Sequence, residues 1–227
     1  SGDVLLPVSA MSRAEVGENF WKGCFATTVL RCRFDGETLA YLEQGNEMSV
    51  PEPRGLCEPS LTDFDGRYRL TLRNDVRGYV TTGVDGLHFD APIPWRFDDG
   101  EELGSYNTQQ HWVTHSDGLS LTYTRRGAGN DHVIRHRAPL FIAQVDPERM
   151  VVLRATERIL VPDRGAQLGN FGVVDASRDE TWVVTGEGMR GDAEKPQELA
   201  RSEARGANNR IWLARLHWSR PNQRVPW

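Results

Sequence analysis

The sequence predicts an all-β protein, and three observations carry this prediction. Runs of β-branched and aromatic residues recur along the chain, and apolar and polar side chains alternate in them with the two-residue period of a half-buried strand. Asp-Gly pairs separate several runs, in FDGE, FDGR, VDGL and SDGL, where glycine accepts the positive φ that tight hairpin turns need. Only residues 192–205 have a helical pattern, and Pro196 interrupts it.

The predicted strands fall into groups of the size of a propeller blade. Four runs lie between Glu58 and Trp95, and four more between Asn107 and Leu160. A unit of about forty to fifty residues with four antiparallel strands is typical of one blade. Three strands precede these units and three follow them. We therefore expect a single β-propeller domain, residues 1–227, with about four blades. A sandwich of about fourteen strands is the alternative.

The three-stranded units at the two ends of the chain would leave strand edges open. A propeller closes by completing a blade from both ends of its chain, and an open edge exposes unpaired backbone groups. We therefore expect that the chain is incomplete at its N-terminus. By itself it should either pair with another copy through the exposed strands or bury its edges with residues 192–205.

Charge and composition exclude several partners. The net charge of -5 disfavours nucleic acid and anionic membrane surfaces, because both require a basic protein surface. No apolar run approaches the roughly 20 residues of a membrane span. Cys24, Cys32 and Cys57 are odd in number and lack CxxC spacing, which predicts buried thiols rather than a zinc site or disulfides. The histidines show no metal-binding spacing either, so we expect neither a metal nor a cofactor.

The stretch SYNTQQHW places amides, a phenol and an imidazole at the start of a predicted inner strand. If this strand lines the central funnel, Tyr106, Asn107, Gln109 and His111 would pair with sugar hydroxyls, and Trp112 would cover a sugar face. The alternative is that the amides tie a loop between blades while Trp112 fills the gap between two sheets.

A second polar stretch, RRGAGNDHVIRHR, extends from Arg125 to Arg137. It gathers four arginines and two histidines in an acidic protein. Strand alternation would direct Arg135 and Arg137 to one face, with His136 opposite. The stretch is either a solvated charged hairpin or a clamp for the carboxylate of an acidic sugar.

Several segments resemble the C-terminal blades of the sialidase superfamily, which are six-bladed propellers with BNR or Asp-box repeats. The segments are EPSL, FDGRYRLTLRND, TTGVDGLHF, HSDGLSLTYTRR, RHRAPLFIAQVD and GNFGVVDASRDETWVVTGE. Within that superfamily, the chain resembles bacterial sialidase-like proteins. The stretch TGVDGLHF keeps the Asp-Gly and the aromatic residue of an Asp box but lacks its usual serine and tryptophan. The resemblance implies about six blades, of which this chain holds about four, and an extracellular or periplasmic location.

The resemblance also implies site residues. Glu58 and Arg73 match the glutamate and the arginine that follow each other on neighbouring inner strands, and Arg137 matches a later arginine that binds a substrate carboxylate. The family's tyrosine nucleophile is replaced here by Asn170 or Phe171 in LGNFGVV. A third arginine and an acid/base aspartate would belong to blades that this sequence does not contain.

Three classes of function remain open. The first is a sialidase-like glycoside hydrolase that acts on a sugar or sugar acid without the tyrosine nucleophile, through the paired carboxylates Glu58 and Glu187. The second is a polysaccharide lyase in which His111 or Tyr106 abstracts a proton next to a uronate carboxylate. The third is a propeller that binds carbohydrate without catalysis.

Overall fold

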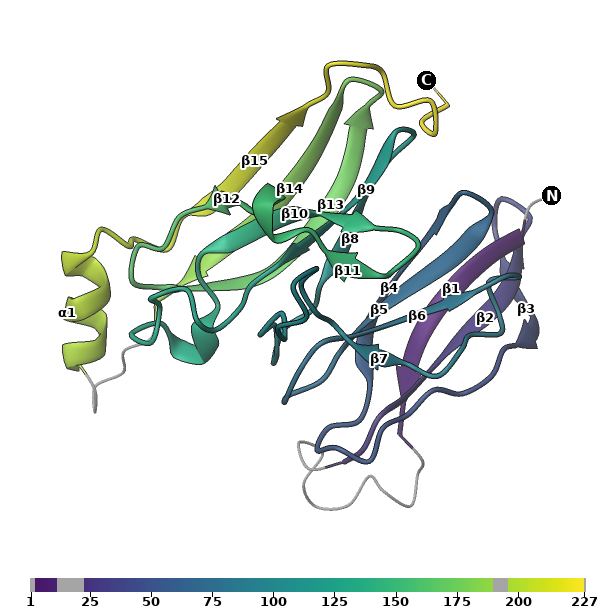
Figure 1. The fold of residues 1–227 in the computed structure, drawn as a ribbon, viewed down its shortest axis with the longest axis horizontal. Helices are drawn as coiled ribbons and strands as arrows, with labels where there is room; N and C mark the ends of the chain where they lie inside the picture. Colours follow the sequence, from purple (N-terminus) through teal and green to yellow (C-terminus); the bar gives the residue numbers. More distant parts are fainter. Residues whose placement is uncertain (1–2, 12–22, 190–195, 227) are drawn as a thin grey trace.

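A computed structural model describes residues 3–11, 23–189 and 196–226, which form four antiparallel sheets and an α-helix (Figure 1). The strands of the first sheet are β1 (Asp3–Ala10), β2 (Ala26–Phe34) and β3 (Leu39–Gln44). Those of the second are β4 (Cys57–Phe64), β5 (Arg67–Arg73), β6 (Tyr79–Gly83) and β7 (Ile93–Pro94). The third consists of β8 (His111–His115), β9 (Gly118–Tyr123), β10 (Leu140–Asp146), β11 (Val151–Val152) and β12 (Arg158–Val161). The fourth has β13 (Gln167–Ser177), β14 (Glu180–Gly188) and β15 (Ile211–His217).

These sheets confirm the strand groups that the sequence predicts, with one difference in the third sheet. The run MVVLRATERIL was expected to form one strand, but a 3-10 turn (Arg154–Thr156) divides it into β11 and β12, which both pair with β10. Between them the backbone N–H of Gln144 donates to the Thr156 hydroxyl at 2.8 Å. Where the chain bends, the Thr156 hydroxyl thus accepts a hydrogen bond that a strand backbone would otherwise accept.

The first strand of each sheet is the inner one. Neighbouring sheets contact each other through β1 and β4, β4 and β8, and β8 and β13. Apolar clusters fill the space between successive sheets, with Leu70 and Val29 between the first two, Trp112 and Val80 between the next two, and Phe171 and Leu140 between the last two. Separate sheets packed face to face around inner strands are the arrangement of a β-propeller rather than of a two-sheet sandwich.

The Asp-Gly hairpins form as predicted at three of the four positions. Asp65 and Gly66, between β4 and β5, have φ of 49° and 69°, as a type I′ turn requires. Gly36 and Gly86 also have positive φ. The exception is Gly118, which begins β9 and pairs with His115, so that residues 116–117 alone form the loop. The predicted role of that glycine was wrong because the two-residue loop is shifted by one position, to Ser116 and Asp117.

The predicted helical segment is α1 (Pro196–Ala204). Pro196 begins the helix instead of interrupting it, because the first turn has no backbone hydrogen bond for proline to remove. Residues 192–195 of the predicted segment lie outside the described residues. The Ser202 hydroxyl donates to the Gly165 carbonyl at 2.9 Å and holds α1 over the loop before β13. None of the helices in the described ranges is long and apolar enough to cross a membrane.

After β15, residues 218–226 form a C-terminal strap across the far ends of the inner strands. Asn222, which is completely buried, donates to the Thr114 carbonyl and accepts from the Ser116 N–H, both at 3.0 Å. Arg224 contacts Asp63 of β4 at 2.6 Å. The strap therefore connects the second sheet with the third.

All three cysteines are free thiols. Cys32 and Cys57 are buried, as predicted, and Cys24 is partly buried.

Candidate functional site

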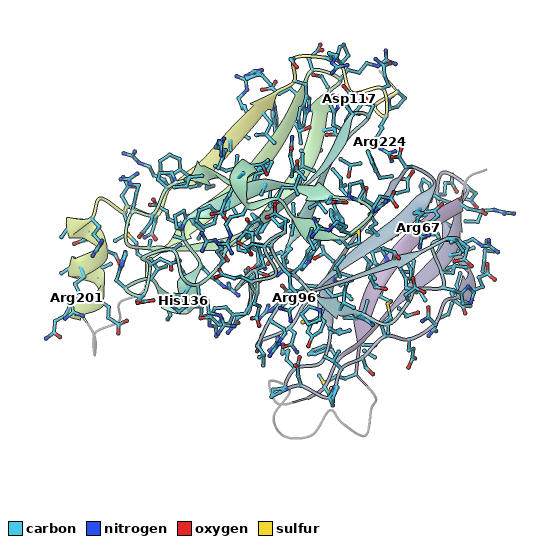
Figure 2. The ribbon with its side chains drawn as sticks, in the orientation of Figure 1. Arg67, Arg96, Asp117, His136, Arg201 and Arg224 are labelled. Carbon is cyan, nitrogen blue, oxygen red and sulfur yellow. The ribbon has the colours of Figure 1, made fainter. Side chains whose placement is uncertain are left out.

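The first strands of three neighbouring sheets begin at one end of the molecule, opposite the C-terminal strap. Glu58 is the second residue of β4, His111 is the first of β8, and Asn170 lies near the start of β13. Arg73 ends β5 and reaches the same end because it pairs with Cys57 across the sheet. Figure 2 labels His136 near this end and Asp117 at the opposite one.

The guanidinium of Arg73 is the centre of the polar cluster. Its Nη1 donates to Glu58 Oε1 at 2.5 Å, and its Nη2 donates to Asp75 Oδ1 at 3.0 Å and to Asn107 Oδ1 at 2.9 Å. Only 7% of the Arg73 side chain is exposed, whereas 34% of the Glu58 side chain is. The cluster thus fixes a buried cation beneath a partly accessible carboxylate.

Asn107 joins this cluster to the second predicted arginine. Arg137 is buried, and both its Nε, at 3.1 Å, and its Nη2 donate to the backbone carbonyl of Asn107. The structure therefore brings together Glu58, Arg73, Asn107 and Arg137, which lie far apart in the sequence. Asp75 is a member that the sequence analysis missed, although its place two residues after Arg73 in LRND was a usable signal.

Two polar atoms of the cluster are buried and have no hydrogen-bond partner among the described residues. They are Glu58 Oε2 and Arg73 Nε. Buried polar atoms are almost always paired, and an exception is common where a ligand or a reacting group will supply the partner. Glu58 thus has one oxygen held by Arg73 and one that can accept a hydrogen bond from a ligand.

Four residues in or next to the Arg73 cluster have a strained backbone conformation. Glu58, Asn107, Arg135 and His136 have positive φ, between 47° and 57°, a region that residues other than glycine rarely adopt. Each such residue costs about 1–3 kcal/mol and is commonly found at functional sites.

Two shifts in strand pairing, of the kind that a β-bulge produces, occur at the same end of the sheets. The pairing of β4 with β5 shifts between Cys57 and Ser60, and that of β13 with β14 shifts between Leu168 and Phe171. Glu58 and Asn170 both lie in these shifts, and bulges redirect side chains at functional sites. Asn170 is exposed.

His111 lies against the cluster from the third sheet. Its ring packs on Phe171, with ring centroids 5.3 Å apart. Burial lowers the pKa of His111, and this effect exceeds the opposing influence of the Glu58 charge and a hydrogen bond with the Phe171 backbone. The imidazole is therefore held in its neutral form at neutral pH. Phe171 itself is buried and carries no hydroxyl.

A polar hollow of about 330 Å³ extends from His111 between the three inner strands. Ser60, Thr62 and Thr114 line it together with Asp175 of β13, and Arg224 of the C-terminal strap lines it as well.

Tyr106 and His136 form a hydrogen-bonded pair next to the cluster. The Tyr106 hydroxyl and His136 Nδ1 are 2.5 Å apart, and His136 Nε2 lies 3.2 Å from Asp131 Oδ1. The expected strand alternation of Arg135 and Arg137 was wrong. Residues 134–136 form a 3-10 turn with positive φ at Arg135, so this segment is not a strand.

Gln109 and Trp112 make structural contacts. Gln109 is buried, and its Nε2 donates to the Phe171 carbonyl at 3.3 Å, which ties the loop to β13. Trp112 is 6% exposed, packs edge-on against Trp95 and donates to the Ser60 carbonyl at 2.9 Å. These contacts leave little of either side chain for a sugar, as the structural alternative for this stretch anticipated.

Glu187 is separate from the cluster. Its carboxylate accepts from the backbone N–H of Asn208 at 2.9 Å and of Arg210 at 3.3 Å, and from Trp212 Nε1 at 3.1 Å. Burial opposes its ionisation, but these hydrogen bonds and Arg164 lower the pKa of Glu187 overall. Only 1% of the side chain is exposed. Such a saturated, enclosed carboxylate positions the end of β14 and does not form a pair with Glu58.

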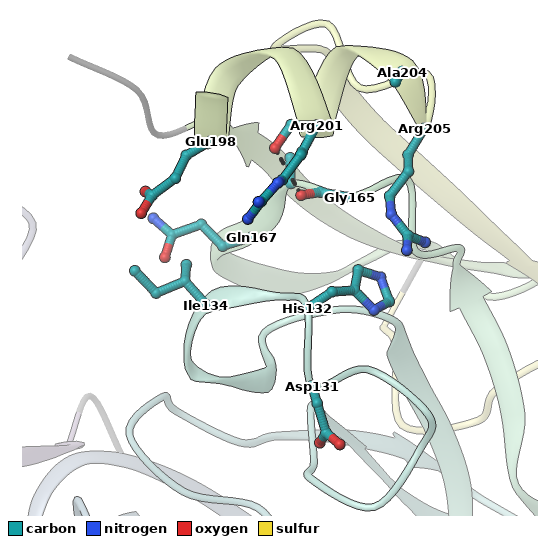
Figure 3. A pocket seen from close by; sticks show the side chains of 12 residues that line it. Asp131, His132, Ile134, Gly165, Gln167, Glu198, Arg201, Ala204 and Arg205 are labelled. Carbon is teal, nitrogen blue, oxygen red and sulfur yellow. Dashed lines mark hydrogen bonds between the residues drawn. The ribbon is translucent and has the colours of Figure 1, made fainter. Parts of the chain in front are cut away.

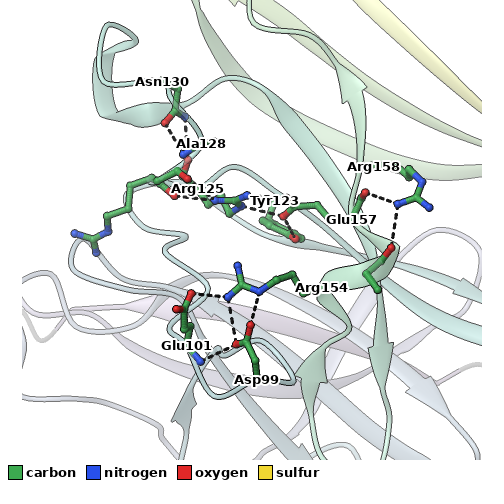
Figure 4. A network of polar contacts seen from close by, with 12 residues as sticks. Asp99, Glu101, Tyr123, Arg125, Ala128, Asn130, Arg154, Glu157 and Arg158 are labelled. Carbon is green, nitrogen blue, oxygen red and sulfur yellow. Dashed lines mark hydrogen bonds and ion pairs between the residues drawn. The ribbon is translucent and has the colours of Figure 1, made fainter.

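Arg125, the first arginine of the polar stretch, belongs to a structural network (Figure 4). It binds Glu157 through two bonds of 2.9 and 2.7 Å, and the Tyr123 hydroxyl donates to the same carboxylate at 2.6 Å. The predicted clamp therefore does not include Arg125.

A cavity of about 730 Å³ lies between α1 and residues 131–134 (Figure 3). Arg201 of α1 and Gln167 of β13 both line it. A further cavity of about 530 Å³ lies near the C-terminal strap, beside His115 and Trp218. Neither cavity is lined by a residue of the Arg73 cluster.

No family model and no curated protein matches this sequence. Solved structures do match its fold. An α-L-arabinofuranosidase from Lactobacillus brevis gives a TM-score of 0.51 at 8% identity, over 98% of this chain and 72% of that one. An α-L-arabinanase from Cellvibrio cellulosa, complexed with arabinohexaose, gives 0.50 at 13% identity, over 96% and 71%. A GH43 β-xylosidase/α-arabinofuranosidase from a compost microbial metagenome gives 0.51 at 11% identity, over 95% and 66%.

The protein has a β-propeller fold. At these identities the likeness concerns the fold alone, and this chain spans about two thirds of the length of the matched structures. The sialidase type and the number of blades in the whole ring stay predictions.

Proposed function

We propose that this protein is a carbohydrate-active propeller of the sialidase-like type that hydrolyses a glycosidic bond, with Glu58 as its general base. The observation that carries the proposal is the state of the Glu58 carboxylate. Arg73 holds one oxygen, while the other is buried and lacks a partner among the described residues. An oriented carboxylate with a free oxygen is suited to taking a proton from water.

Water is the proposed nucleophile because the family resemblance places Asn170 or Phe171 where the tyrosine would stand, and neither side chain has a hydroxyl. Phe171 is the one that contacts His111. Glu58 would take a proton from the water as the water oxygen bonds to the anomeric carbon and the glycosidic bond breaks.

The substrate would be a sugar or a sugar acid. Arg73 contacts both Glu58 and Asp75, so its charge is offset within the cluster. Arg137, which is buried and donates to the Asn107 carbonyl, is the arginine proposed to orient a substrate carboxylate, in the role that the family resemblance implies. The exposed amide of Asn170 would pair with sugar hydroxyls.

The test is a turnover screen of the protein on sialosides, glucuronides, xylosides and arabinofuranosides, with Glu58→Gln and Arg137→Ala beside it. We expect Glu58→Gln to reduce turnover on every substrate by about 10²–10⁴-fold. Arg137→Ala should affect acidic sugars more than neutral ones.

Other outcomes would identify the alternatives. An unsaturated sugar product, detected by its ultraviolet absorbance, would show a lyase. Binding of an oligosaccharide without turnover, with Glu58→Gln binding as well as the unchanged protein, would show a carbohydrate-binding propeller.

A further inference from the structure

The proposed hydrolysis, on which this inference rests, requires a proton donor for the leaving oxygen. The carboxylates of the cluster are poorly suited to this role. Glu58 and Asp75 both contact the guanidinium of Arg73, at 2.5 and 3.0 Å. A carboxylate that faces a guanidinium acts as a proton acceptor rather than a donor. Among the described residues, other groups near the cluster are better candidates for the acid.

Tyr106 and His136 are the pair that geometry favours. The 2.5 Å between the Tyr106 hydroxyl and His136 Nδ1 is short for a hydrogen bond between a phenol and an imidazole. The Arg126 guanidinium lies 4.6 Å from the centre of the Tyr106 ring. Arg126 and Asp131 are the charged groups that contact this pair among the described residues.

The pair is attached directly to the cluster through the backbone. Tyr106 precedes Asn107, whose side chain binds Arg73, and His136 precedes Arg137, which binds the Asn107 carbonyl. The pair therefore lies beside the residues that hold Arg73.

The turn that carries His136 is held in a strained conformation by a buried side chain. The Nδ2 of Asn130, which is completely buried, donates to the His136 carbonyl at 3.3 Å and to the Ala138 carbonyl at 2.7 Å. His136 has φ of 53° and Arg135 has φ of 57°. Strain that the surrounding structure enforces is typical of catalytic and switching segments. The position of the imidazole is thus fixed, at a cost in backbone energy.

We infer that Tyr106 is the catalytic acid of this site and that His136 supplies its proton. In the reacting state His136 is protonated on both nitrogens, with Nε2–H toward Asp131. As the bond between the anomeric carbon and the leaving oxygen breaks, its electron pair stays on that oxygen. The oxygen takes the Tyr106 proton, and Tyr106 takes the Nδ1 proton of His136. Glu58 gains a proton from the attacking water, so charge and protons balance. Afterwards Glu58 releases a proton to solvent and His136 regains one.

The chemistry of the three side chains suits this relay. Histidine changes its charge near neutral pH, whereas a phenol alone holds its proton to about pH 10. The cation above the Tyr106 ring favours negative charge on the phenol oxygen during the transfer. Because the reaction is a single displacement by water, the product should have the inverted anomeric configuration.

The first test uses Tyr106→Phe on two glycosides of the same sugar, one with an alkyl leaving group and one with a dinitrophenyl leaving group. The second leaves without a proton. We expect Tyr106→Phe to lower kcat/KM for the alkyl glycoside by about 10²–10⁴-fold and to change it little for the dinitrophenyl glycoside. Tyr41→Phe, at an exposed position of β3, is the matched control and should change neither. An equal loss on both glycosides would overturn the assignment.

The second test examines His136 through the pH profile. The variant is His136→Asn, because asparagine also tolerates positive φ. In the plot of kcat/KM against pH, the alkaline limb should move, since it reports the loss of the His136 proton. The acidic limb should stay, since it reports Glu58. An unmoved alkaline limb would contradict the relay. A first product with retained configuration by proton NMR would instead contradict direct attack by water with Glu58 as the base.

The failures of the two proposals are distinguishable. If Glu58→Gln removes turnover on both glycosides but Tyr106→Phe affects both equally, the hydrolase assignment stands and the relay falls. If the unchanged protein turns over neither glycoside although it binds them, the hydrolase assignment falls and the relay with it.

Discussion

The two ends of the inner strands differ in how their polar groups are satisfied. At the end where β4, β8 and β13 begin, Glu58 Oε2 and Arg73 Nε are buried without partners among the described residues, and four residues have strained φ. At the opposite end, Asn222 uses its side chain for three hydrogen bonds, to Thr114, Ser116 and the N–H of Arg224.

The difference shows how one scaffold divides its tasks. The hydrogen bonds of the C-terminal strap hold neighbouring sheets together, because each satisfied buried group adds stability. Strained residues and unpaired buried atoms lower stability, and they are retained where a ligand or a reaction uses them. Four substitutions test this difference.

Replacing Asn107 with glycine should damage function and spare stability. Glycine accepts the φ of 56° without strain, while the amide that positions Arg73 disappears. We expect a loss of about 10²-fold in kcat/KM, as small misplacements of catalytic groups cause. The melting temperature, measured by circular dichroism, should stay close to that of the unchanged protein. A large fall in melting temperature would mean that this end also carries the fold.

Asn222→Ala should have the opposite effect at the strap. The loss of its side-chain bonds leaves buried backbone groups unpaired and should lower the free energy of unfolding by about 2–3 kcal/mol. For a chain of this size that corresponds to roughly 4–12 °C in melting temperature. Denaturant unfolding measures it, and kcat/KM well below the transition should not change. If kcat/KM well below the unfolding transition differs between Asn222→Ala and the unchanged protein, the strap also influences the site.

Glu187→Gln should cost about 1–2 kcal/mol of stability and leave turnover intact, because the residue serves backbone N–H groups and Trp212. The pKa of Glu187 in the folded state is lowered below 4.5. The ionised carboxylate therefore adds to the free energy of unfolding above pH 4.5, and this contribution disappears as the pH falls through the folded-state pKa. Unfolding at pH 7 and at pH 3 should therefore show a smaller effect of the substitution at pH 3. Loss of turnover would restore Glu187 as a catalytic candidate.

The smallest effect should come from His111. Its folded-state pKa is lowered below 6.5, so the unfolded chain binds more protons as the pH falls below 6.5. Stability should decline over that interval and level off below the folded value. In His111→Gln the fall in the free energy of unfolding below pH 6.5 should be smaller, because the titration of His111 no longer contributes to it. Equal pH profiles of unfolding for both proteins would show that the imidazole is not held neutral.

The sequence was a good guide to strands and a partial guide to the site. Period-two alternation and Asp-Gly turns located the strand groups, because both signals depend on neighbouring residues. Glu58, Arg73, Asn107 and Arg137 were found through residue type and family resemblance. Trp112 illustrates the limit, since an aromatic residue at a strand start suits a sugar face as well as a core, and only its packing against Trp95 distinguishes them.

The sequence by itself determined that the chain is all-β, where its sheets begin and end, and which arginines and carboxylates are available. Tertiary structure alone decided which of them meet. Glu187 pairs with the segment before β15 rather than with Glu58, Asp75 joins Arg73, and Tyr106 reaches His136 across thirty residues. Hydrogen bonds and ion pairs act over a few ångströms. Contacts between sheets depend on bulges, turns and packing that no local pattern of residues specifies.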